Sequence, residues 1–220
     1  MSDRVAVSVE AGAKKAFATA VDWPGWSRSG KTEEAAIAAL AGYAERYAPI
    51  ATAAGETLGS DRLDIDVVEH VHGGGATDFG VPEQVTTQDR RPVTAAGGRR
   101  LAALVEAAWM AFDEIAEHAP EELRKGPRGG GRTTSKIVDH VLGSEQGYAR
   151  VMGIKRREFP TSDRAQLDEL RAEVLEILRA PSDGSVIAGK KWTTRYAAHR
   201  IAWHALDHAW EIEDRTEPEG

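Results

Sequence analysis

The chain has no cysteine among its 220 residues. Disulfides, thiolate metal ligands, iron–sulfur clusters and cysteine nucleophiles are therefore excluded, and any metal must be held by histidine, carboxylate, carbonyl or water ligands. No apolar run approaches the roughly 20 residues that span a bilayer, and the opening Met-Ser-Asp-Arg lacks the apolar core of a signal peptide. We therefore expect a cytoplasmic protein without a membrane partner.

Positive charge is also scarce, because 28 Lys and Arg residues face 35 Asp and Glu residues, for a net charge of -7. A general nucleic-acid binder needs a positive face to neutralise phosphates, so we expect no nucleic-acid partner. The sequence also lacks a GxSxG motif, a P-loop, and a GxGxxG in strand–helix context, which removes several common enzyme classes. What remains is a composition that is 41% hydrophobic and 29% charged, as in a globular protein.

The first third of the chain has the alternating pattern of strands. Residues 5–9, 16–21 and 63–71 alternate, while Thr32 begins a helix that Pro49 should end or kink. The pattern predicts a small ββαβ domain over residues 1–72. Residues 73–95 begin with three glycines and are predicted to be an exposed linker.

From residue 96 the apolar spacing becomes helical. It predicts a helix that ends before Pro120, a second over residues 134–152, a third from Asp163 to Pro181, and a fourth capped by Thr193 or Thr194. Such amphipathic helices predict a four-helix bundle over residues 96–214, followed by a tail over residues 215–220. The fold class is therefore α+β with two domains.

Histidines are placed as metal ligands would be. His204 and His208 are four residues apart, so they share one helix face, and His140 on another helix is our candidate for a third ligand. The alternative is that such a pair is chance or consists of ordinary half-buried histidines. His199 lies five residues before His204 and should point away from it, as a polar cap or surface group.

Two motifs carry a family resemblance. Asp139-His140-x-x-x-x-Glu145 and Ala202-Trp203-His204-x-x-x-His208 resemble the second-helix and last-helix motifs of the DinB/YfiT-like superfamily. The resemblance covers about residues 95–214 and implies an up-down-down-up bundle whose three histidines bind a divalent metal, most often nickel or zinc. It also implies a thiol-dependent S-transferase that takes a mycothiol-type low-molecular-weight thiol and a small-molecule electrophile. We expect a homodimer.

Residues near the proposed ligands have candidate roles. Glu145 and Glu211 could accept the second N–H of a ligating imidazole, with Asp139 and Asp207 as weaker candidates. The basic side chains of Arg200 and Arg132 could hold an anionic group of the thiol.

Residues 15–35 carry a second resemblance. A Pro24-Gly25 turn followed by Gly30-x-Thr32-x-Glu34-Ala35 is similar to the HicB-like domain, which in antitoxins binds a small toxin partner. No helix-turn-helix or ribbon-helix-helix segment accompanies it. The alternative to a metalloenzyme is therefore a non-enzymatic interaction module, with a HicB-like partner-binding domain and a structural or vestigial metal site.

Overall fold

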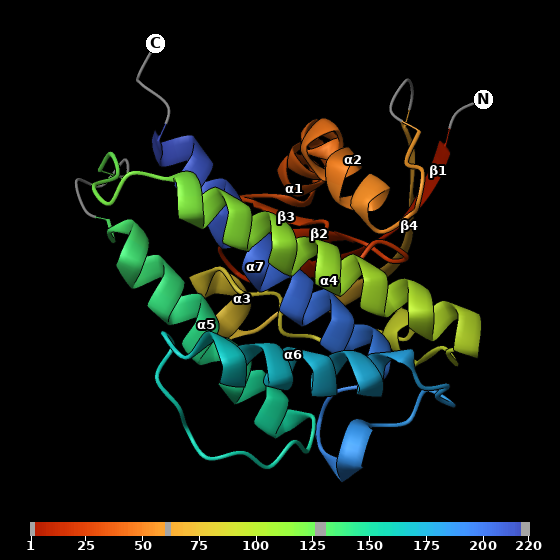
Figure 1. The fold of residues 1–220 in the computed structure, drawn as a ribbon. Helices are drawn as coiled ribbons and strands as arrows, with labels where there is room; N and C mark the ends of the chain where they lie inside the picture. The colour runs from red at the N-terminus through yellow and green to blue at the C-terminus, as the bar shows by residue number, and fades with distance from the viewer. Residues whose placement is uncertain (1–2, 60–62, 126–130, 217–220) are drawn as a thin grey trace.

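The computed structural model describes residues 3–59, 63–125 and 131–216 (Figure 1). Its first part is a sheet with the strand order β3-β2-β1-β4, in which β1 runs antiparallel to β2 and parallel to β4. The strands are β1 (Asp3–Ala11), β2 (Ala16–Ala20), β3 (Ser27–Gly30) and β4 (Leu63–His72). Strand β3 was not predicted, because four mostly polar residues show no alternation of apolar side chains.

The helix predicted at Thr32 is divided into α1 (Glu33–Gly42) and α2 (Ala44–Ala53). Thr32 caps α1 as expected, its Oγ1 accepting from the Ala35 N–H at 3.2 Å. The division falls at Tyr43 and not at Pro49, which lies inside α2. The two helices then cover different partners, since α1 packs on β2 and β3 whereas α2 packs on α4.

The predicted linker contains short helices, α3 (Gly75–Phe79) and η1 (Gln88–Arg90), and it is fastened to the sheet. The carboxylate of Glu10 on β1 accepts hydrogen bonds from Thr77 Oγ1 at 2.5 Å, Glu83 N at 3.1 Å and Gln84 N at 3.0 Å. The segment therefore follows the sheet surface. The division into domains at residues 72 and 96 stays a prediction.

The rest of the chain forms the long helices α4 (Ala95–His118), α5 (Thr134–Val151), α6 (Arg164–Arg179) and α7 (Thr194–Thr216). Asp163 caps α6, and Thr193 caps α7 by accepting from the Tyr196 N–H at 3.3 Å. Helix α4 packs against α6 and α7, and α5 packs against the same two helices. Helix α7 runs two residues past the predicted bundle end at 214, and residues 217–220 of the predicted tail lie outside the described part.

Helix α7 also packs against the sheet, which positions the candidate site relative to the first part of the chain (Figure 1). The rings of Phe17 and Trp203 meet edge to face at 6.1 Å, and Arg28 pairs with Asp207 at 2.9 Å. The sheet is thus covered by α1 on one side and by α7 on the other. Among the described residues, no helix is both long and apolar enough to cross a membrane.

Candidate metal centre

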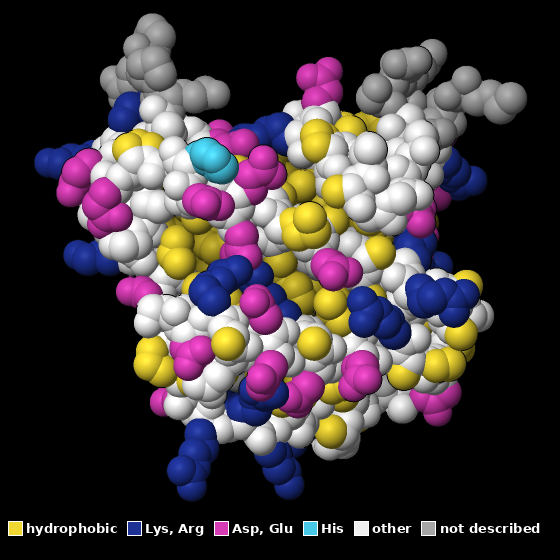
Figure 2. Space-filling view, in the orientation of Figure 1, with side chains coloured by type: hydrophobic (Ala, Val, Ile, Leu, Met, Phe, Trp, Pro, Cys, Tyr) yellow, Lys and Arg dark blue, Asp and Glu magenta, His cyan; other side chains and the backbone are white. Residues whose placement is uncertain are grey.

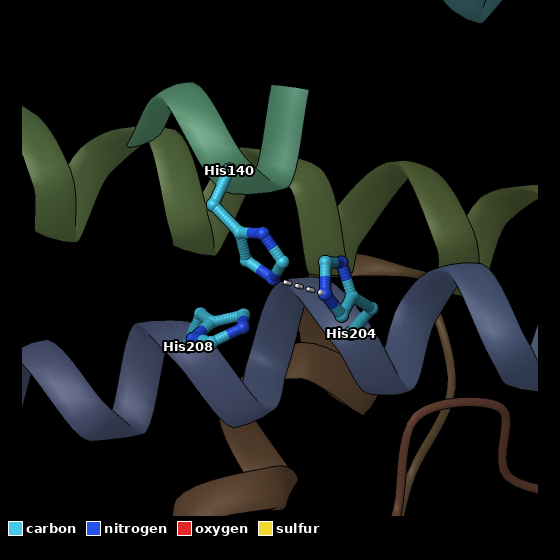
Figure 3. Close-up of side chains that lie close together, drawn as sticks. All are labelled: His140, His204 and His208. Atoms are coloured by element: carbon cyan, nitrogen blue, oxygen red, sulfur yellow. Dashed lines mark hydrogen bonds between the residues drawn. The ribbon is translucent and has the colours of Figure 1, made fainter. Parts of the chain in front are cut away.

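Three histidines from two helices meet at one point, as Figure 3 shows. The Nε2 atoms of His140 and His204 lie 3.2 Å apart, and His208 completes a group in which one nitrogen from each ring lies within 4.8 Å of the others. Nitrogens that share one ion about 2.1 Å away are expected to lie roughly 3 to 3.5 Å apart. The His140–His204 pair matches this spacing, whereas the limit of 4.8 Å for the whole group is wider than expected. The three residues are called the histidine cluster below.

The helical spacing explains the convergence. His204 and His208 stand one turn apart on α7 with ring centroids 4.8 Å apart, as residues four apart on a helix should. The packing of α5 against α7 brings His140 over both rings, 5.0 Å from each. The cluster therefore depends both on the four-residue spacing of His204 and His208 and on the packing of α5 against α7.

The histidine cluster lies between the core and solvent. His204 is 7% exposed, His208 is half-buried and His140 is exposed. On the inner side the rings of Tyr148 and Trp203 lie 5.6 and 6.0 Å from that of His204. The aromatic residues cover the inner side of the histidine cluster, and its exposed member is His140.

Burial and nearby basic groups favour the neutral form of His204 and His140. Burial lowers the pKa of His204 to about 2, with further lowering by the nearby His208 and His140. Burial likewise lowers the pKa of His140, assisted by the positive charges of His208 and Arg132. A neutral imidazole offers the lone pair that a metal needs, so neither ring has to lose a proton before it binds one near pH 7.

Glu211 orients the third imidazole. Its Oε2 lies 2.8 Å from His208 Nδ1, and its Oε1 accepts from Arg215 Nη1 at 3.0 Å. The hydrogen bond from His208, together with the hydrogen bond and charge of Arg215, lowers the pKa of Glu211 against the opposing effect of burial. An ionised Glu211 accepts a hydrogen bond from the Nδ1–H of His208, which leaves the Nε2 lone pair of that ring available to a metal.

Glu145, the other predicted carboxylate partner, does not reach the cluster. It lies five residues after His140, about 140° around the helix, and so points to another face. It is buried against Arg171, which donates to both of its oxygens at 2.8 and 2.9 Å and also pairs with Asp113 at 2.7 Å. Burial raises the pKa of Glu145, which the hydrogen bonds from Arg171 oppose.

The two weaker candidates for a carboxylate partner of the histidines, Asp139 and Asp207, also bind elsewhere. Asp139 accepts from Thr161 Oγ1 at 2.6 Å, and Asp207 pairs with Arg28.

The two predicted anion-binding arginines lie near the cluster without contacting it in the hydrogen bonds described. Arg200 donates to the Pro82 carbonyl at 3.2 Å, and its guanidinium carbon lies 4.9 Å from the Trp203 ring centroid. Arg132 is exposed, and its carbonyl accepts from Arg215. Both arginines contribute to the lowered pKa of His204, so both add positive potential there.

The predicted place of His199 was wrong, and the role of Arg215 was not predicted. His199 is buried rather than at the surface, and its Nε2 lies 3.0 Å from the Val21 carbonyl. Arg215 links Glu211 to the α4–α5 connection through the carbonyls of Arg124 and Arg132, at 2.7 and 2.9 Å. The spacing of Arg215, four residues after Glu211, was the signal that could have shown this pair.

Comparison with known proteins supports part of the expected relationship. Residues 104–212 match the family model described as the DinB superfamily. This range contains all three histidines of the cluster and supports a DinB-like helical part. The search of curated proteins and the search of solved structures gave no match. The HicB-like resemblance of the first part of the chain gains no support from any of these comparisons.

Proposed function

We propose that this protein holds a divalent metal, nickel or zinc, on His140, His204 and His208, in an up-down-down-up bundle of the DinB type. The convergence of three imidazole nitrogens within 4.8 Å carries this proposal. The donor set suits the ion, because imidazole is a common ligand of nickel and zinc and three protein ligands leave a coordination position for another molecule. The histidine cluster lies within the part of the chain that matches the DinB superfamily.

The reaction that fits best is S-transfer from a low-molecular-weight thiol. The chain has no cysteine, so the thiol must be a second substrate. A bound divalent metal supplies a Lewis acid that lowers the pKa of such a thiol. In the transfer the sulfur–carbon bond forms, the electrophile's leaving group departs with its electron pair, and the thiol proton is released.

The chain's own residues would serve substrate binding and orientation. The positive charges of Arg200 and Arg132 favour an anionic group on a polar, mycothiol-type thiol. Glu211 holds the Nδ1 proton of His208 and thereby fixes the direction of that ring. The exposed side of His140 is the side from which thiol and electrophile would enter.

A spectroscopic titration tests the proposal. Protein purified without a histidine tag is analysed for metal and then prepared in its cobalt form, to which a mycothiol-type thiol is added. We expect one ion per chain and a new thiolate-to-metal charge-transfer band. Arg200→Ala should weaken the thiol titration and leave the metal content unchanged, because arginine is not a ligand.

Each negative result has its own meaning. Failure to bind metal contradicts the site itself. Metal binding with an unchanged spectrum contradicts the thiol-transferase part and supports a structural metal in a non-enzymatic protein.

A further inference from the structure

A second pocket lies on the other side of α7, between that helix and the sheet. Its walls come from β1, β2 and the following Val21, β3, residues 82–89 and α7, and its lining residues do not include the histidine cluster. The pocket has a volume of about 530 Å³ including the open space at its mouth. It therefore has room for a small molecule or for one end of a larger molecule.

Two buried polar atoms belong to residues that line this sheet–α7 pocket. They are Nδ1 of His199 and Nε1 of Trp203, and neither has a hydrogen-bond partner within the described part of the chain. His199 is 9% exposed and Trp203 is 4% exposed. Leaving such a group unsatisfied costs about 1–3 kcal/mol, which points to a ligand that supplies the missing hydrogen bonds.

The two atoms need opposite hydrogen-bond partners, a donor for His199 Nδ1 and an acceptor for Trp203 Nε1. The Nε2–H of His199 donates to the Val21 carbonyl at 3.0 Å, so the proton is on Nε2 and Nδ1 is an acceptor. Burial lowers the pKa of His199, which keeps this ring neutral. The Trp203 indole N–H can only donate. Because the two residues are four apart on α7, the acceptor and the donor share one face of the helix.

The pocket's other polar groups disfavour an anion. Its carboxylates, Glu10 and Asp89, are buried and already accept hydrogen bonds, those of Asp89 coming from Thr86 N and Oγ1 at 2.8 and 2.7 Å. Arg200 is the guanidinium that lines the pocket, and it donates to the Pro82 carbonyl. Two negative charges against one positive charge oppose a carboxylate or phosphate ligand.

We propose that the sheet–α7 pocket binds an uncharged molecule through a hydroxyl or primary carboxamide group. The oxygen of that group accepts from the Trp203 indole N–H, and its own O–H or N–H donates to His199 Nδ1. A carboxylate cannot donate a hydrogen bond to His199 Nδ1, and an amidinium cannot accept one from the Trp203 indole N–H. Neither group should therefore bind in this way. The proposal does not depend on the metal site.

Matched probes of nearly one shape provide the test. Acetamide, acetate and acetamidinium are titrated separately into the ¹⁵N-labelled protein, with propan-2-ol as the hydroxyl probe. Acetamide or propan-2-ol should shift the Trp203 indole N–H and the His199 Nδ1 resonances, with an affinity in about the millimolar range for so few atoms. The indole of Trp26, which donates to the Leu40 carbonyl at 2.9 Å, is the internal control and should not move.

A variant pair checks the assignment. Trp203→Phe keeps an aromatic ring and removes the N–H, so acetamide binding should weaken about tenfold, or about 1.4 kcal/mol. Trp192→Phe, outside the pocket lining, should leave the affinity unchanged. The proposal is overturned if neither acetamide nor propan-2-ol shifts the Trp203 indole N–H and His199 Nδ1 resonances of the wild-type protein. That result would mean that the pocket takes up water alone. Equal shifts with acetate or acetamidinium would overturn it too.

Discussion

Helix α5 carries a member of each of two polar clusters that have opposite characters. His140 belongs to the histidine cluster, whereas Glu145 belongs to a cluster with Arg171 and Asp113. In the Arg171 cluster every charge faces an opposite charge, with Arg171 10% and Glu145 5% exposed. In the histidine cluster three like groups face one another.

The two clusters differ in how their polar groups find partners. The Arg171 cluster satisfies its own hydrogen bonds and holds α4, α5 and α6 together. The histidine cluster has one internal hydrogen bond, between the Nε2 atoms of His140 and His204 at 3.2 Å, and no opposite charge among its three rings. Their ring nitrogens lie within 4.8 Å of one another, an arrangement that could hold a metal ion.

The largest expected effect is on the self-satisfied cluster. Arg171→Met leaves Glu145 buried without its partner, and removing one member of a buried pair costs about 3–5 kcal/mol in the free energy of unfolding. Urea denaturation measures the loss. The matched control is Arg164→Met, because Arg164 pairs with Asp113 at 2.8 Å from an exposed position and should cost at most about 1 kcal/mol. Equal losses for the two variants would contradict the comparison.

The histidine cluster should respond in metal binding. His204→Ala removes the most buried ligand, and we expect metal affinity to fall at least about a thousandfold, or about 4 kcal/mol. Calorimetric titration with nickel or zinc gives the affinity. His118→Ala is the control, because His118 is exposed at the end of α4 and its Nδ1 meets the Glu114 carbonyl. Unchanged affinity in His204→Ala would contradict the site.

A smaller change in metal affinity is expected for Glu211, which contacts a proposed ligand but is not one itself. Glu211→Gln keeps an oxygen for His208 Nδ1 but removes the charge, and loss of such a partner typically weakens metal binding about 10- to 100-fold. Glu213→Gln is the matched control, since Glu213 pairs with Arg46 at 2.6 Å instead. If both variants bind metal like the wild type, Glu211 does not orient the ligand.

The smallest expected effect is the pH dependence of the stability that the Asp113 ion pairs contribute. Burial opposes ionisation of Asp113, but hydrogen bonds from Arg171 and Arg164 prevail and lower its pKa. A lowered folded-state pKa means that the stabilisation is complete above the unfolded value of about 3.9 and disappears as pH falls through the folded value. The stability gap between wild type and Asp113→Asn should therefore narrow in acid. Urea denaturation at about pH 6 and below pH 3 measures it, and a constant gap would contradict the ion pair.

The sequence predicted those elements whose signals are local. Thr32 and Asp163 cap helices where expected, because an N-cap needs only its own side chain and the following turn. The three histidines were also predicted, because helical spacing and the family motifs agreed. Strand β3 was missed because its four mostly polar residues show no apolar alternation, and the division at Tyr43 was missed because that side chain packs on Trp210, far away in the chain.

The predicted surroundings of the site were less accurate for the same reason. Glu145 was misplaced because nearness in sequence outweighed its 140° rotation from His140. His199 was expected at the surface, but the sheet that buries it is about 180 residues away in the chain, at Val21. Sequence periodicity shows which face a residue occupies, whereas the element that covers that face depends on the tertiary fold.

Arg215 fastens the two sides of the α4–α5 connection to α7. Its Nε and Nη2 hold the carbonyls of Arg124 and Arg132, while Thr134 N donates to the Glu121 carbonyl at 3.0 Å. A protein cut between residues 125 and 131 would therefore keep its new ends on the same helix. One fragment would end near Arg124, and the other would carry all three histidines. The two fragments should stay associated, so the α4–α5 connection is a suitable place to divide the chain into two complementing fragments.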